Sequence, residues 1–210
     1  MKYFKVYGER RSGTKFLREH IKINTNLTWI SDHWKDPLGW KHGQLDIQDI
    51  KNSGYINNTL FCLVVKHPLS WLVSMYRNPP HMEHMKELLF EDFLFSEWDE
   101  SNIMDKRGNP APDKYKRKYE NIFKLREYKL QSHLQIQTLP NHRIFKVEDI
   151  FAGKEFEKAI PTETNFSMLS DVREYYKNEE WRQMFSDELI EKIKSQLNIE
   201  LEHQIGYELT

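Results

Sequence analysis

The stretch YFKVYGERRSGTKFL, residues 3–17, reads as a strand, a turn and the beginning of a helix, and this order decides the fold. Tyr3 to Tyr7 is rich in aromatic and β-branched residues and ends at Gly8, which predicts a strand. Apolar residues recur at helical spacing from Phe16 onward, which predicts a helix beginning near Thr14. The turn between them would present backbone N–H groups and the positive end of a helix dipole. Such an environment favours an anion.

The same order recurs later in the chain. Leu60 to Val65, LFCLVV, is continuously apolar and predicts a strand buried on both faces, as is typical of parallel sheets. Pro68 suits the first turn of the helix that follows. We predict a third strand at Arg143–Val147 and a late helix at Asp187–Leu197. Alternating strands and helices predict an α/β fold, with a mostly parallel central sheet flanked by helices and right-handed crossovers.

Length and composition predict one compact domain without a global charge bias. The chain has 210 residues, so we expect residues 1–210 to form a single domain. Its 31 basic and 32 acidic side chains predict no general attraction to nucleic acid or to an anionic membrane. The single cysteine, Cys62, excludes an internal disulfide and lies in an apolar run typical of a core. Without a leader-like segment or ~18 consecutive apolar residues, the chain is expected to be soluble and cytoplasmic.

The region from residue 83 to residue 130 differs in character from the rest. Glu83 to Glu100 contains seven acidic residues and one lysine, whereas Asp105 to Leu130 contains nine basic and four acidic residues. The favoured interpretation is two solvated helices joined by the Gly108–Pro112 loop. The alternative is a helical lid or insertion whose basic arm meets an anionic ligand and binds the acceptor.

The turn after the first strand is nearly a triphosphatase phosphate loop. Gly8 and Gly13 have the spacing of G-x-x-x-x-G-K-[S/T], but Thr14 precedes Lys15 where the motif has the lysine first. Such enzymes also need a hydroxyl group for magnesium and usually an aspartate at the end of a neighbouring strand. LFCLVV ends instead at Lys66, which would repel magnesium and attract a second anion. Both departures predict a metal-free ligand with two phosphate-bearing ends.

Two motifs resemble sulfotransferases that use 3′-phosphoadenosine 5′-phosphosulfate (PAPS). RRSGTKFL, residues 10–17, is similar to their 5′-phosphosulfate loop, in which a basic residue precedes Ser-Gly-Thr. VVKHPLSWLVSMYR, residues 64–77, is similar to their 3′-phosphate site, in which a strand ends in a basic residue and a serine follows eight residues later. Here these residues are Lys66 and Ser74.

The resemblance extends weakly to KVEDIFAGKEF, residues 146–156, and to IGYEL, residues 205–209. The family usually has arginine in place of Lys66, and lysine keeps the charge but loses the bidentate geometry. The glycine-rich Arg-Lys-Gly segment of cytosolic small-molecule members is not found. We therefore expect a branch nearer those acting on carbohydrate or protein.

The resemblance implies metal-independent, in-line transfer of a sulfuryl group to a hydroxyl of a carbohydrate, small molecule or peptide, with adenosine 3′,5′-bisphosphate as product. This chemistry needs a cation at the leaving oxygen and a base for the acceptor hydroxyl. Arg11 matches the family's cation, and it is preferred over Arg10 because successive turn residues point in different directions. Phe16 falls where some members hold adenine, or it is a core residue. The implied cofactor site comprises Arg10, Ser12, Gly13, Thr14, Lys15, Phe16, Lys66 and Ser74.

The candidate base is His42, with Lys41 beside it in GWKHGQ. Cytosolic sulfotransferases carry Lys-x-His some twenty residues before the basic residue of the 3′-phosphate site, and His42 precedes Lys66 by 24. The usual pKa of histidine, about 6.5, suits proton removal at neutral pH. The alternatives are His33, a carboxylate such as Asp32 or Glu9, or a structural role for His42.

Two other functions stay open: a kinase with an altered phosphate loop, which would bind ATP with magnesium, and a non-catalytic nucleotide-binding module. The His81–His84 pair lacks a third ligand and predicts no metal site. Trp34 and Trp40 are core residues or an acceptor wall that stacks on a sugar ring. Glu148 is expected to cap a helix or pair with lysine.

Overall fold

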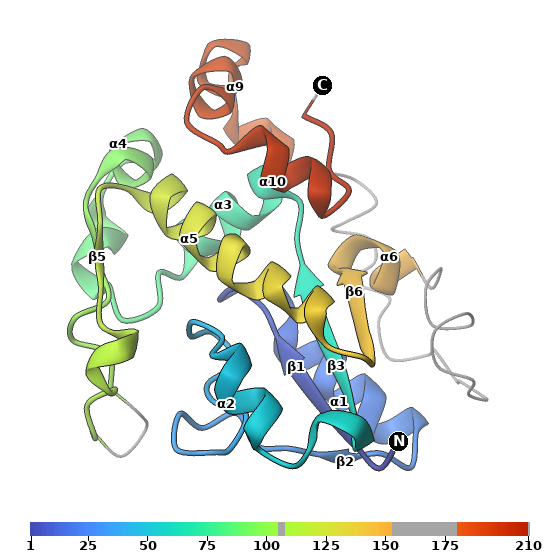
Figure 1. The fold of residues 1–210 in the computed structure, drawn as a ribbon. Coiled ribbons are helices and arrows are strands. Elements are labelled where there is room, and N and C mark those ends of the chain that lie inside the picture. Colours follow the sequence, from blue (N-terminus) through green and yellow to red (C-terminus); the bar gives the residue numbers. More distant parts are fainter. Residues whose placement is uncertain (105–107, 153–179, 210) are drawn as a thin grey trace.

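A four-stranded parallel sheet forms the centre of the molecule (Figure 1). The computed structural model describes residues 1–104, 108–152 and 180–209. The strand order is β2-β1-β3-β6, and the predicted α/β fold with a parallel sheet is confirmed. The strands are β1 (Tyr3–Tyr7), β2 (Thr28–Trp29), β3 (Thr59–Val65) and β6 (His142–Lys146).

Helices cover both faces of this sheet, as the buried strand β3 predicts. Alternate side chains of β3 point to opposite faces, and all seven residues are buried. One set, which includes Cys62, packs with α1 (Thr14–Asn24) and α6 (Val147–Ala152). The other set, which includes Leu63, packs with α5, α10 and the segment around α2. These helices are α2 (Ile47–Asn52), α5 (Ile122–Leu134) and α10 (Ile199–Gln204). Figure 1 shows α1 behind the sheet and α5 crossing in front of it.

A second apolar cluster lies beyond the end of β3 and joins α3, α4, the start of α5 and α9. Pro68 occupies the first turn of α3, as predicted. In this cluster, α3 spans Pro68–Arg77, α4 spans Phe90–Phe95 and α9 spans Asp187–Lys194. Short 3-10 segments are η1 (Ile56–Asn58), η2 (Glu83–Glu87), η3 (Asp113–Tyr115), η4 (Gln135–Thr138) and η5 (Glu180–Met184).

Two predicted boundaries differ from the structure. The third strand is one residue earlier than predicted, because Val147 already begins α6. The late helix ends at Lys194 instead of Leu197, because Asn198 caps a separate helix, α10, by accepting a hydrogen bond from the amide of Leu201. The stretch KVEDIFAGKEF, residues 146–156, resembles the family only weakly. Its last four residues, 153–156, lie outside the described residues.

The region from 83 to 130 is not the expected pair of solvated helices. It contains α4, an antiparallel pair of β4 (Trp98–Asp99) with β5 (Lys118–Tyr119), and most of α5. Nine residues of α5 are buried, among them Arg126 and Lys129, so the solvated interpretation was wrong for this helix. Arg126 and Lys129 are accommodated in the interior because each forms ion pairs there. Among the helices of the described residues, none has the length and apolarity to cross a membrane.

Candidate functional site

A cleft of about 1060 Å³ collects the predicted site residues. It is lined by the turn after β1, the start of α1, the end of β3 and the last two turns of α3. All predicted site residues except Ser12 line it, together with four residues that were not predicted to belong to the site. The full lining is Arg10, Arg11, Gly13, Thr14, Lys15, Phe16, Glu19, Lys41, His42, Lys66, Ser74, Arg77, Asn78 and Pro80.

Two glycines shape the turn between β1 and α1. A Cβ atom on Gly8 would lie 2.5 Å from the carbonyl oxygen of Val64, so only glycine fits beside β3. Gly13 has φ +91° and directly precedes α1. The first N–H groups of a helix have no partner within the helix, and Gly13, Thr14 and Lys15 at the start of α1 line the cleft, where such groups favour an anion. Ser12 is buried and its hydroxyl donates to the carbonyl oxygen of Glu9 (2.7 Å), so its side chain holds the turn together.

Arg11 has a left-handed backbone, with φ 63°, and its exposed side chain donates from Nε to the carbonyl oxygen of Asn78 (3.1 Å). This conformation is unusual for a bulky residue, and such strain is concentrated at functional sites. The turn therefore holds the Arg11 side chain across the cleft toward the end of α3.

The strain at Arg11 predicts a stability difference between two variants. The left-handed conformation costs a residue with a Cβ roughly 1–2 kcal/mol, of which the freedom of glycine in the unfolded chain offsets part. We expect Arg11→Gly to have a higher free energy of unfolding than Arg11→Ala by about 0.5–1 kcal/mol in urea titrations. Lys15, which lies in α1, is the control: there Gly should be less stable than Ala by about 1 kcal/mol. The same order of stability at both positions would contradict the strained turn.

Lys66 and Ser74 meet in the same cleft. The ammonium group of Lys66, directly after β3, donates a hydrogen bond to the Ser74 hydroxyl on α3. Burial lowers the pKa of Lys66 to about 8; Glu148 opposes this, while Arg77 and Arg11 lower it further. Lys66 thus lies among other cations, and an anion at this position would relieve their repulsion. Arg77 was missed in the sequence, although it lies one helical turn after Ser74.

His42 lies beside the turn after β1, because its side chain and the neighbouring Lys41 both contact Gly8. The amide of Gly8 donates to the carbonyl oxygen of Lys41 (3.1 Å), and Nδ1 of His42 lies 2.7 Å from the carbonyl oxygen of Gly8. A carbonyl oxygen only accepts hydrogen bonds, so Nδ1 carries the proton and Nε2 has the free lone pair. Burial lowers the pKa of His42 well below its usual value, and Arg10 and Lys41 lower it further. His42 is therefore a neutral imidazole at neutral pH.

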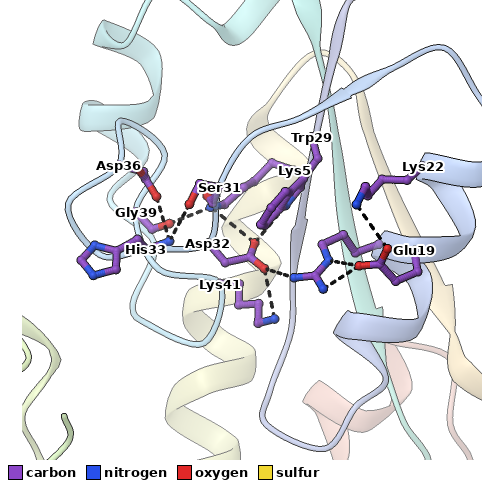
Figure 2. A network of polar contacts seen from close by, with 11 residues as sticks. Lys5, Glu19, Lys22, Trp29, Ser31, Asp32, His33, Asp36, Gly39 and Lys41 are labelled. Atoms are coloured by element: carbon purple, nitrogen blue, oxygen red, sulfur yellow. Dashed lines mark hydrogen bonds and ion pairs between the residues drawn. The ribbon is translucent and has the colours of Figure 1, made fainter. Parts of the chain in front are cut away.

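Asp32 positions Lys41 and is itself held by cations (Figure 2). Its carboxylate lies 3.1 Å from Nζ of Lys41, 3.3 Å from Nη1 of Arg18 and 3.7 Å from Nζ of Lys5. Lys5 is fully buried and also donates to the carbonyl oxygen of Gly39 (2.8 Å). Asp32 is not part of the cleft lining, so the structure places it as a support for Lys41 and not beside a reacting hydroxyl.

The remaining candidate bases lie away from the cleft lining. Nδ1 of His33 accepts a hydrogen bond from the amide of Lys35 (3.2 Å). Glu9 is buried behind the turn, where its carboxylate contacts Nη1 of Arg126 (2.6 Å). His42 is thus the predicted base that the structure brings to the cleft.

Arg126 connects the turn, β3 and the C-terminal helix. Besides Glu9, it binds Glu202 on α10 (Nε to Oε1, 2.6 Å) and the carbonyl oxygen of Lys66 (Nη2, 2.9 Å). Burial alone would lower the pKa of Arg126, but Glu202 and Glu9 raise it overall, so this guanidinium stays charged. Burial raises the pKa of Glu9 to about 7 despite Arg126, and Glu202 adds to the rise. This network fixes Glu9 and Lys66, the residues that begin the two loops of the cleft.

Trp34 and Trp40 form a buried aromatic cluster with Tyr115, so the core interpretation is confirmed and the acceptor wall is not. The ring of Trp40 packs against His42 at 5.7 Å between centroids. Arg10 lies over Trp40, with its guanidinium carbon 4.9 Å from the ring centroid. Arg10 and Arg11 therefore point in different directions, as expected of successive turn residues.

Glu148 accepts hydrogen bonds from the amide of His67, directly before α3 (2.9 Å), and from the hydroxyl of Tyr207 (2.6 Å). The expected capping role is confirmed. Phe16 is half-buried and packs on Phe151 at 4.6 Å between centroids while it lines the cleft. In the part of the chain that the structure describes, no three His, Cys, Asp or Glu residues are grouped as metal ligands would be.

Comparison with known proteins adds no assignment, because no protein-family model, no curated protein and no solved structure matches the chain. The functional assignment rests on the geometry of the cleft.

Proposed function

We propose that this protein is a sulfotransferase that transfers the sulfuryl group of PAPS to a hydroxyl acceptor. One observation carries the proposal: the turn at Arg11–Lys15 and the Lys66–Ser74 pair, predicted separately from two motifs, line the same cleft. Each end of the cleft presents cations and donors suited to a phosphate group. Adenosine 3′,5′-bisphosphate and PAPS carry two such groups at opposite ends of one ribose.

The residues of each end fit one of these groups. Lys66, Ser74 and Arg77 supply the cations and the hydroxyl for the 3′-phosphate. The N–H groups at the start of α1, with Lys15, supply donors for the 5′-phosphosulfate. Phe16, at the surface of α1, supplies an aromatic face for the adenine.

His42 and Arg11 carry the chemistry in this proposal. PAPS, when bound, supplies a sulfuryl group whose bond to the phosphate oxygen breaks as a bond to the acceptor oxygen forms. His42 accepts the hydroxyl proton at Nε2, since Nδ1 already donates to Gly8. Arg11 offsets the charge that develops on the leaving phosphate oxygen. Asp32 holds Lys41 beside this region.

The kinase alternative lacks the carboxylate that magnesium requires. Within the described lining of the cleft, Glu19 is the one acidic residue, and it is paired with Arg18 (2.6 Å) and Lys22 (3.3 Å). The residue at the end of β3, where a triphosphatase usually has an aspartate, is Lys66. No observation favours this alternative or a non-catalytic module over the sulfotransferase.

The first test is a thermal-shift titration with adenosine 3′,5′-bisphosphate. A ligand at about 100 times its dissociation constant adds ~2.7 kcal/mol to the free energy of unfolding. We expect the bisphosphate to raise the melting temperature whether or not EDTA is present. A shift only with ATP and magnesium would favour the kinase, and a bisphosphate shift without sulfation of any acceptor would favour the non-catalytic module.

Variants at the two ends of the cleft should separate binding from transfer. Lys66→Ala should weaken binding of the bisphosphate by about 1.5–3 kcal/mol, the range for a hydrogen bond to a charged group. Arg11→Ala should lower kcat by about 10²–10³-fold and weaken bisphosphate binding less, because its charge acts on the leaving oxygen. Calorimetric titration and sulfation kinetics measure the two effects. Equal losses of affinity in both variants would contradict the assigned roles.

A further inference from the structure

Arg10, which the resemblance placed in the cofactor site, lies on the side of the cleft where His42 lies. Its guanidinium covers one face of Trp40, and the ring of Trp40 packs edge-on against His42. Arg10 also contributes, after burial, to the lowered pKa of His42, in keeping with their proximity. Arg11 instead points to Asn78 at the end of α3. The two successive arginines therefore serve different parts of the cleft.

The hydrogen-bonding capacity of Arg10 is largely unused. Its Nε lies 3.8 Å from Oε1 of Glu100, an ion-pair distance too long for a hydrogen bond. Nε and Nη2 are buried and have no hydrogen-bond partner in the described parts of the chain. The side chain is only 14% exposed. A buried charged donor without a partner is costly, so a group that accepts from Arg10 would stabilise the site.

Glu100 does not neutralise Arg10, because it already has closer partners. Its Oε2 lies 2.7 Å from Nζ of Lys129 and 3.4 Å from the hydroxyl of Tyr119. Arg10 and Lys129 are thus two cations that share the Glu100 carboxylate, and Lys129 is the closer of the two. Lys41 adds a second cation next to His42 in the sequence, and it lines the cleft.

We propose that the acceptor hydroxyl belongs to a molecule that also carries an oxyacid anion, a carboxylate or a sulfate ester, and that Arg10 binds this anion while the hydroxyl lies at Nε2 of His42. This inference rests on the proposed sulfotransferase function. A guanidinium suits the task because its charge is permanent and attracts both anions, and the Arg10 side chain lines the cleft. Arg10 thereby acts as a specificity-determining residue, whereas Lys66 and Arg11 serve the cofactor.

The test is a binding experiment that does not need turnover. Protein saturated with adenosine 3′,5′-bisphosphate is titrated in a calorimeter with three matched sugars: methyl glucoside, methyl glucuronide and methyl glucoside 6-sulfate. The three sugars have the same ring hydroxyls and differ at one position, which is neutral in the glucoside and negatively charged in the glucuronide and the 6-sulfate. We expect one or both anionic sugars to bind about 10–100-fold more tightly than the neutral one, as a charge-assisted hydrogen bond would give. The two anionic arms separate a carboxylate from a sulfate ester.

The variant R10Q assigns the preference to Arg10. In R10Q the anionic and neutral sugars should bind with the same affinity to within about threefold, since glutamine fills similar space without the charge. R143Q, the same change at an exposed arginine of β6 outside the cleft lining, should keep the preference. Equal binding of all three sugars by the unmodified protein, no binding of either anionic sugar, or a preference that persists in R10Q would each overturn the inference. Failure of the bisphosphate to bind at all would instead reject the proposed function.

Discussion

Arg126→Met is expected to lower the free energy of unfolding by about 3–5 kcal/mol, the largest stability effect that we predict for a single substitution. Arg126 is 1% exposed and binds Glu9 and Glu202 at 2.6 Å each. Methionine would keep much of the packing against Trp71 but leave two buried carboxylates without their cation. Urea unfolding monitored by tryptophan fluorescence would measure the loss.

The triple variant Arg126→Met, Glu9→Gln, Glu202→Gln is the matched control. Removing the carboxylate charges together with the guanidinium removes the uncompensated charge, so most of the lost stability should return. If Arg126→Met alone unfolds within about 1 kcal/mol of the unmodified protein, the buried network does not have the energetic role that we assign to it. A triple variant less stable than the single variant would contradict the role of uncompensated charge.

His42→Asn should reduce kcat of sulfation by about 10²–10⁴-fold, the range that general-base catalysis contributes. The asparagine amide can still donate to the carbonyl oxygen of Gly8, as Nδ1 does, but it offers no base in place of Nε2. The turn should therefore keep its shape, and calorimetry should give an unchanged affinity for adenosine 3′,5′-bisphosphate. The loss would then belong to the proton transfer alone.

The pH profile gives a second measurement of the same role. In the proposed mechanism the neutral imidazole is the active form, and burial holds the pKa of His42 well below the usual 6.5. The acidic limb of kcat/KM, which reports the free enzyme, should therefore lie well below pH 6.5 and should be absent in His42→Asn. An acidic limb that persists in the variant, or a kcat loss under tenfold, would move the base to another residue.

Much of the fold and one half of the cleft follow from local sequence. The aromatic and β-branched stretch Tyr3–Tyr7, the apolar run Leu60–Val65 and the helical spacing after Thr14 match the observed burial, and the structure places them as predicted. Lys66 and Ser74 are eight residues apart along one strand end and the next helix, so local geometry alone brings them together. A strand followed by a glycine turn and a helix start has few possible shapes, which is why the turn could be predicted.

The other half of the cleft was decided by the tertiary structure. His42 meets Gly8 across 34 residues, and Arg126 meets Glu9 across 117. Charged residues of α5 look solvated in the sequence, because hydrophobic periodicity reports only which side chains avoid water and not which charges are paired inside. The sequence by itself determined the parallel α/β sheet and the two motifs that line the cleft, since these depend on neighbouring residues. Which cations lie near His42 and which helices hold the loops depended on polar pairs between distant segments. Such pairs leave no periodic pattern in the sequence.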